Sequence, residues 1–140
     1  MAACRAMLMA LLLPDPGEEL CPPEFKTAAR RLLPQVQIRP GPSDAALRKA
    51  LLKFIGDFAN WDFSSDKDYL AVARGLVKSV NPDEPPLVVD PFAGGGSILL
   101  EALRLGCDAF ASDLNPVACL ILKVMLEDIP RYGREKQRPR

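Results

Sequence analysis

Leu87-Val88-Val89-Asp90-Pro91-Phe92-Ala93-Gly94-Gly95-Gly96-Ser97 is the stretch that decides the fold. Residues 87–89 are apolar, and the paired valines favour a buried strand. Asp90 and Pro91 are expected to end this strand, because proline has no N–H to donate to a sheet. The consecutive glycines permit a sharp turn, and Ser97 can cap a helix over residues 98–105. A strand, a glycine turn and a helix in this order direct free backbone N–H groups at an anion.

The glycine turn lacks the residues of two common phosphate-binding loops. A P-loop ends in Gly-Lys-Ser/Thr, and no lysine follows these glycines. A dinucleotide fingerprint has the form G-x-G-x-x-G, and Leu99 occupies the place of its third glycine. S-adenosylmethionine remains as a candidate ligand, because it carries a carboxylate, an amino group and an adenosine. Residues 94–96 could bind the carboxylate and Asp90 the amino group, while Phe92 could form part of an apolar slot for the adenosine.

A second strand and helix follow the first pair. Residues 108–112 predict a strand that ends at Asp113, and Asn115 and Pro116 are suited to the N-cap and first position of a helix that runs to about Asp128. Asp113 follows Gly94 by 19 positions, close to the spacing at which an acid binds ribose hydroxyls. The helix is expected to turn one apolar face inward: Val117, Leu120, Ile121, Val124 and Met125, widened by Leu122 and Leu126.

These motifs resemble a known family. Residues 90–97 look like the cofactor motif of amino-group DNA methyltransferases, and residues 101–106 and 111–118 extend the likeness. The chain is most similar to the amino-terminal part of adenine-specific DNA methylases whose full-length members also carry a zinc ribbon. The resemblance implies an α/β fold, a partial Rossmann-like S-adenosylmethionine methyltransferase unit. It implies that the cofactor S-adenosyl-L-methionine contacts Asp90, Pro91, Phe92, Ala93, Gly94, Gly95, Gly96, Ser97, Asp113, Leu114 and Asn115.

The catalytic motif of that family is missing. The family holds the adenine amine with a tetrapeptide of the form Asp/Asn-Pro-Pro-Tyr/Phe, and this sequence contains none. We therefore assign no catalytic residue and expect the amino-terminal piece of a longer methylase, or a truncated homologue, that is inactive by itself. DNA would be bound through the full-length enzyme or a partner chain, and a second polypeptide could complete the sheet. A non-catalytic remnant or partner subunit, and a methylase of RNA or a small molecule, stay open as alternatives.

Composition narrows the remaining classes. The chain has 140 residues, enough for one domain, and 18 basic and 18 acidic residues, so bulk charge does not predict nucleic-acid binding. It has no histidine, and its cysteines lack the C-x-x-C spacing of a zinc site, so we expect no metal. Cys107 and Cys119 are expected to be reduced core thiols of a cytoplasmic protein. Residues 1–13 are apolar apart from Arg5 and too few to cross a membrane, so we predict that they form a buried helix.

The chain divides into a helical region at 1–80, the cofactor unit at 87–128 and a basic tail at 129–140. Helices are predicted at 24–33, 44–59 and 66–80, with Ser43 or Asp44 capping the second and Ser64 or Ser65 the third. Trp61 and Phe63 lie between the last two helices, where they could plug the core or form an apolar wall near adenine. The tail is expected to be a solvated terminus.

Overall fold

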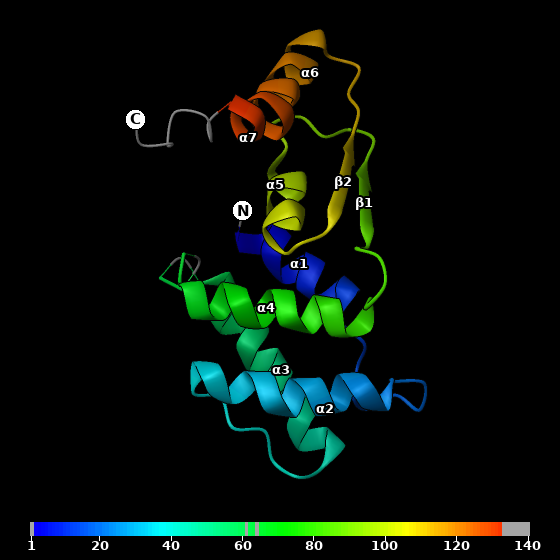
Figure 1. The fold of residues 1–140 in the computed structure, drawn as a ribbon, viewed down its shortest axis with the longest axis vertical. Helices are drawn as coiled ribbons and strands as arrows, with labels where there is room; N and C mark the ends of the chain where they lie inside the picture. The colour runs from blue at the N-terminus through cyan, green and yellow to red at the C-terminus, as the bar shows by residue number, and fades with distance from the viewer. Residues whose placement is uncertain (1, 61, 64, 133–140) are drawn as a thin grey trace.

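The computed structural model describes residues 2–60, 62, 63 and 65–132 (Figure 1). Its amino-terminal half contains the helices α1 (Ala2–Leu12), α2 (Pro23–Leu32), the 3-10 turn η1 (Leu33–Val36), α3 (Asp44–Ala59) and α4 (Lys67–Val80). Its carboxyl-terminal half contains β1 (Leu87–Asp90), α5 (Ser97–Arg104), β2 (Asp108–Ala111), α6 (Pro116–Lys123), the π-helical turn η2 (Val124–Asp128) and α7 (Ile129–Tyr132). The chain is therefore a mixed α/β structure with a small parallel sheet.

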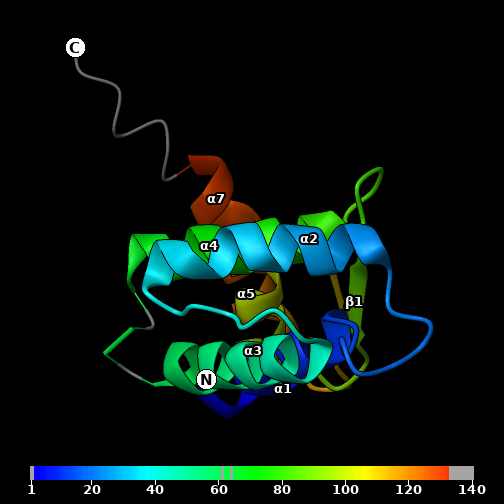
Figure 2. The same ribbon diagram turned by 90° about the horizontal axis from the view of Figure 1, so that it is seen from below.

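The predicted helices of the first half are confirmed within a residue or two. α2 and α4 lie side by side, and α1 packs against both α3 and α5 (Figures 1 and 2). Apolar side chains at helical spacing bury one face of each helix, as in α3, where Leu47, Leu51, Phe54 and Phe58 are buried. Trp61, and the basic residues after Tyr132, lie outside the described residues, so the expectations for them are untested.

Helix caps follow the sequence in one case and depart from it in another. Ser43 caps α3, because its hydroxyl accepts a hydrogen bond from the Ala46 N–H at 3.2 Å. The expectation that Ser64 or Ser65 caps α4 is wrong, since the Asp66 carboxylate accepts the N–H groups of Asp68 and Tyr69 at 2.8 and 3.1 Å. A carboxylate adds a favourable charge at the positive end of the helix dipole, which a hydroxyl does not.

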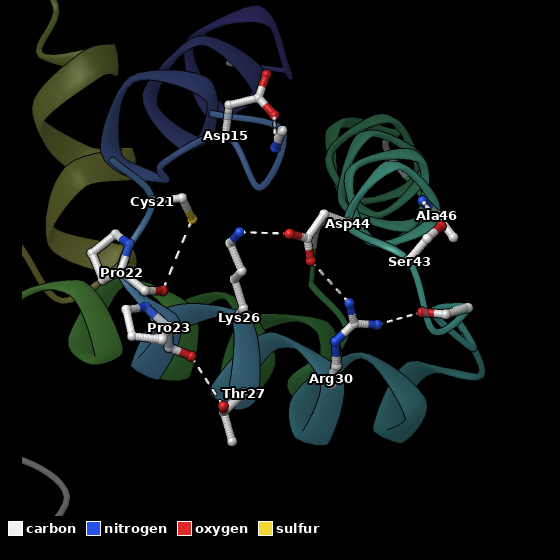
Figure 3. Close-up of polar contacts among 12 residues, drawn as sticks. Asp15, Cys21, Pro22, Pro23, Lys26, Thr27, Arg30, Ser43, Asp44 and Ala46 are labelled. Atoms are coloured by element: carbon white, nitrogen blue, oxygen red, sulfur yellow. Dashed lines mark hydrogen bonds and ion pairs between the residues drawn. The ribbon is translucent and has the colours of Figure 1, made fainter. Parts of the chain in front are cut away.

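Ion pairs fasten α2 to the start of α3 (Figure 3). Lys26 and Arg30, one turn apart on α2, reach Asp44 at 2.6 and 3.2 Å, and Arg30 also donates to the carbonyl oxygen of Gly41. The hydrogen bond from Lys26 holds the pKa of Asp44 below its usual value. These contacts hold the end of the connecting segment, and the start of α3, against α2.

The two strands pair in parallel, so Leu87 lies opposite Asp108 and Asp90 opposite Ala111. Alternate residues point to opposite faces of the sheet. Val88 and Ala109 pack against the helical side, where Figure 1 shows α5 beside the strands. The opposite face carries apolar side chains that are 62%, 55% and 58% exposed, those of Leu87, Val89 and Phe110. We call these three residues the open sheet face.

The burial of α6 differs from the prediction. Ala118 and Leu122 are its buried residues, whereas the residues expected to face inward, among them Val117, Leu120 and Ile121, are 59%, 65% and 43% exposed. The sheet of β1 and β2 is too narrow to cover a wide helix face, so α6 buries only the narrow side that carries Ala118 and Leu122. Cys107, which precedes β2, is buried as expected. Cys119, on α6, is exposed and is not a core thiol.

The core crosses the boundary between the two halves. One hydrophobic cluster includes residues of α1 to α4 together with Ala102, Leu105 and Cys107. A smaller cluster beneath the glycine turn contains Ala93, Leu99 and Leu122. The helical half therefore supports α5, the helix that begins at the glycine turn.

Candidate functional site

Two carboxylates follow the carboxyl ends of neighbouring strands. Asp90 is the last residue of β1, and Asp113 lies two residues beyond the end of β2. Because the strands run parallel and Asp90 is paired with Ala111, both acids lie at the same edge of the sheet. This is the edge at which open α/β sheets bind their ligands.

Asp113 joins the two loops at this edge. Its Oδ2 accepts a hydrogen bond from the Gly94 N–H and its Oδ1 accepts one from the Asn115 N–H, each at 2.8 Å. The N–H groups of Asn115 and Gly94 hold the pKa of this carboxyl below its usual value, so Asp113 is ionised at neutral pH. Each oxygen of a carboxylate can accept a second hydrogen bond, and that capacity remains for a ligand.

The glycine turn has a backbone that only glycine adopts easily. Gly94 and Gly96 have φ angles of 49° and 74°, in the left-handed region. The turn is closed by a hydrogen bond of 2.7 Å from the Gly96 N–H to the Ala93 carbonyl oxygen. Gly96 occupies the N-cap position of α5, and Ser97 is the first residue of the helix. The prediction that Ser97 caps α5 is therefore wrong, because the helix begins one residue earlier than the sequence pattern suggested.

The space around the turn fits a ligand that approaches the backbone. A Cβ atom built on Gly94 or Gly95 would meet no atom within 4 Å, so the turn faces open space. The Gly95 N–H has no hydrogen-bond acceptor within the described part of the chain. Gly96 has a different role, since a Cβ there would lie 2.9 Å from a side-chain carbon of Leu122 on α6. Gly94 and Gly95 leave room for a ligand, and Gly96 leaves room for α6.

Asp90 keeps one carboxylate oxygen for a ligand. Its Oδ1 accepts a hydrogen bond from the Phe92 N–H at 3.1 Å, and its Oδ2 has no partner within the described residues. Phe92 and Leu114, the apolar residues expected at the site, are 75% and 89% exposed. The described chain therefore does not enclose a slot for adenosine, and other side chains would be needed to form one.

The remaining expected residues shape the loops. The Pro91 carbonyl oxygen accepts the Ser112 hydroxyl at 3.2 Å, and the Ala93 N–H donates to the Ser112 carbonyl oxygen at 3.0 Å. Asn115 caps α6, as predicted, by accepting the Val117 N–H at 2.9 Å. These bonds tie the loop after β1 to the loop after β2, so the two loops form a single surface.

A buried ion pair that the sequence did not predict holds α5 in place. The guanidinium of Arg5, on α1, donates from Nε and Nη2 to the two carboxylate oxygens of Glu101 at 2.8 and 2.9 Å. Their side chains are 4% and 1% exposed. Arg5 also donates to the Phe58 carbonyl oxygen at 2.8 Å and lies 5.0 Å from the centre of the Phe58 ring. Glutamate is rarely fully buried unless it is paired, and nothing nearby in the sequence marks Arg5 as the partner of Glu101.

The described residues form neither a metal site nor a membrane-spanning helix. They contain no group of cysteine, aspartate and glutamate side chains arranged to hold a metal ion. Their helices include none long and apolar enough to cross a membrane. Comparison of the chain with protein-family models, with curated proteins and with solved structures gave no match. The loops after β1 and β2 therefore form the candidate site.

Proposed function

We propose that this chain is the cofactor-binding portion of a DNA adenine-N6 methyltransferase with a partial Rossmann-like fold. One observation carries the proposal. The Asp113 carboxylate, beyond the end of β2, accepts a hydrogen bond from Gly94 in the turn after β1, beside Asp90 and the open Gly95 amide. Anion-binding N–H groups and two acids at one sheet edge are what a ligand with a carboxylate, an amine and a ribose requires.

Each group at the site then has a role. When bound, S-adenosylmethionine would supply an activated methyl group. The Gly95 N–H and the start of α5 would attract its carboxylate, because the amino end of a helix carries partial positive charge. The free oxygen of Asp90 would accept the amino group, and the unused lone pairs of Asp113 would accept ribose hydroxyls.

The acceptor is proposed from the resemblance of residues 90–118 to adenine-specific DNA methylases. No Asp/Asn-Pro-Pro-Tyr/Phe tetrapeptide occurs in the 140 residues, so the groups that hold the adenine must come from another segment or another polypeptide. The isolated chain is therefore expected not to methylate DNA. Its reduced, unpaired cysteines agree with a cytoplasmic enzyme.

A second polypeptide that completes the sheet is part of the proposal. Parallel sheets are normally covered by helices on both faces, because each face is apolar. The open sheet face of Leu87, Val89 and Phe110 has no such cover within the described residues. Added helices and strands would bury this face and supply the missing walls around adenosine.

Titration of the ¹⁵N-labelled chain with S-adenosylmethionine, followed by NMR, tests the cofactor assignment. We expect a dissociation constant of about 1 mM, or about −4 kcal/mol, because the adenosine slot is incomplete. Amide shifts should concentrate at Gly94, Gly95 and Asn115, weaken strongly in Asp90→Asn, and persist in Asp83→Asn, which changes an exposed acid outside the site. ATP is the control ligand, because it carries adenosine without the methionine part.

Four results would each overturn part of this assignment. Equal shifts with ATP, or none at about 5 mM S-adenosylmethionine, would remove the cofactor. Calorimetry that gives micromolar binding would contradict an incomplete site. Transfer of a labelled methyl group to DNA by the isolated chain, lost in Asp90→Ala, would show that the chain needs no further catalytic segment.

A further inference from the structure

A pocket of about 440 Å³ lies far along the chain from the glycine turn, in the helical half. It is lined by residues from the end of α3, the start of α4 and the segment after η1. Figure 2 shows the chain between α2 and α3 running between α3 on one side and α2 with α4 on the other. Pockets of about 300–1,000 Å³ commonly hold small organic ligands.

The polar wall of this pocket carries an excess of negative charge. Asp57, Asp66 and Asp68 line it, and Lys53 is the only basic side chain among its lining residues. Lys53 is already paired with Asp57, at 2.7 Å. Asp66 and Asp68 form no ion pair within the described part of the chain, although one Asp66 oxygen caps α4. The unbalanced charge favours a cation and disfavours an anion.

The apolar wall is aromatic. The rings of Phe63 and Tyr69 lie with centres 4.8 Å apart, and Tyr69 stacks in turn on Phe54 at 5.6 Å. Phe63 is 37% exposed, so part of its ring is open to a ligand. Aromatic ring faces attract organic cations, and the attraction grows when the cation leaves water.

Tyr69 supplies an observation that is independent of the acids. Its side chain is only 9% exposed overall, and its hydroxyl forms no hydrogen bond within the described residues. No buried polar side-chain atom of the described chain lacks a partner, so this hydroxyl is the part of Tyr69 that is open at the pocket. Burial, and next the charge of Asp57, raises the pKa of Tyr69, so its hydroxyl stays protonated and neutral at physiological pH. It lines the pocket as an uncommitted donor and acceptor.

We propose that this pocket binds a small organic cation, an ammonium group carried on an apolar body. The ammonium group would lie near Asp66 and Asp68, the apolar body would lie against Phe63, and the Tyr69 hydroxyl would bond a polar substituent. A bare metal ion is not the ligand, because no cluster of acidic side chains in the described chain is arranged to hold one. This site is separate from the glycine turn, so the proposal does not depend on the methyltransferase assignment.

Titration of the ¹⁵N-labelled full chain with three compounds that share a phenyl ring tests the charge preference. Benzylamine is cationic, benzyl alcohol is neutral and benzoate is anionic, while all three carry the same ring. We expect benzylamine to shift the amides of residues around the pocket, such as Lys53, Phe63 and Tyr69, and the other two to shift them much less. Equal shifts with benzyl alcohol, or no shifts with benzylamine, would overturn the proposal.

Variants separate the contributions of the acid and the hydroxyl. Asp68→Asn, at an exposed position, should weaken benzylamine binding about fivefold, the upper range for a solvent-exposed charge pair. The matched control Asp83→Asn, an exposed acid outside the pocket, should leave it unchanged. Tyr69→Phe keeps the stacked ring, and it should weaken 4-(aminomethyl)benzyl alcohol more than benzylamine. Unchanged binding in Asp68→Asn would overturn the proposal even if Tyr69→Phe failed to fold.

Discussion

Replacing Glu101 by glutamine should destabilise the chain strongly, because it leaves the charge of Arg5 buried without a counter-charge. Arg5 and Glu101 are nearly inaccessible and share two hydrogen bonds, of 2.8 and 2.9 Å. Removal of one partner from a buried ion pair costs about 3–5 kcal/mol. Glutamine keeps the shape and one acceptor oxygen, and the Phe58 carbonyl still accepts from Arg5. We therefore expect a loss of about 3 kcal/mol, at the lower end of that range.

Urea unfolding followed by circular dichroism at neutral pH measures this loss. In thermal unfolding, the melting temperature should fall by about 9 °C, at about 3 °C per kcal/mol for a chain of this length. Asp57→Asn, which breaks the exposed pair with Lys53, is the matched control and should leave the unfolding midpoint unchanged. The double replacement Arg5→Met with Glu101→Leu should recover most of the stability, because apolar side chains of similar size avoid the buried charge.

The stability that Glu101 contributes should also depend on pH. Burial raises the pKa of Glu101, but the hydrogen bonds and charges of Arg5 and Arg104 outweigh it and hold the pKa below its usual value. The contribution is therefore complete above the unfolded pKa of about 4.3 and is lost as the pH falls from there through the folded pKa. The difference between the native chain and Glu101→Gln should shrink over that range. A difference below about 0.5 kcal/mol at pH 7 would refute the buried pair.

Four further substitutions address the glycine turn and the sheet. Gly96→Ala should lower the free energy of urea unfolding by about 1–3 kcal/mol, because the φ angle of Gly96 is 74° and a Cβ would lie 2.9 Å from an α6 side chain. Gly95→Ala, whose Cβ would meet open space, should change it by less than about 0.5 kcal/mol. Asp113→Ala should speed hydrogen exchange of the Gly94 amide, which loses its acceptor; unchanged exchange would mean that the two loops are not joined. We expect the open sheet face to cause self-association in sedimentation experiments. Val89→Thr should reduce it without lowering the melting temperature, since Val89 is 55% exposed.

Local patterns in the sequence predicted the elements whose burial is local. The bounds of α3 and the Asn115 cap of α6 followed from spacing and cap chemistry alone, and Ser43 was one of two residues expected to cap α3. The prediction of which α6 residues face inward was wrong, because periodicity shows which face is apolar but not whether enough sheet is present to cover it. The cap of α4 was wrong because several polar residues stand together before that helix, and each could serve.

At the candidate site, the sequence placed both acids and the glycines at one sheet edge, but not the bonds among them. The 2.8 Å bond between Gly94 and Asp113 depends on how two loops meet, which spacing suggests without specifying. The Arg5–Glu101 pair depends on packing between α1 and α5, so neither residue carries a local signal. The roles assigned to the site residues stay predictions until a ligand is measured.

Arg5 and Glu101 are separated by 96 positions, and this distance sets an order of events during synthesis. α1 leaves the ribosome before α5, so the carboxylate that neutralises its arginine is translated about 5–20 s later at about 5–20 residues per second. Until then α1 cannot bury that arginine at low cost, and it can pack against α3 but not against α5. If translation pauses or ends before α5 is made, α1 is held loosely, and the incomplete chain is exposed to proteases and chaperones.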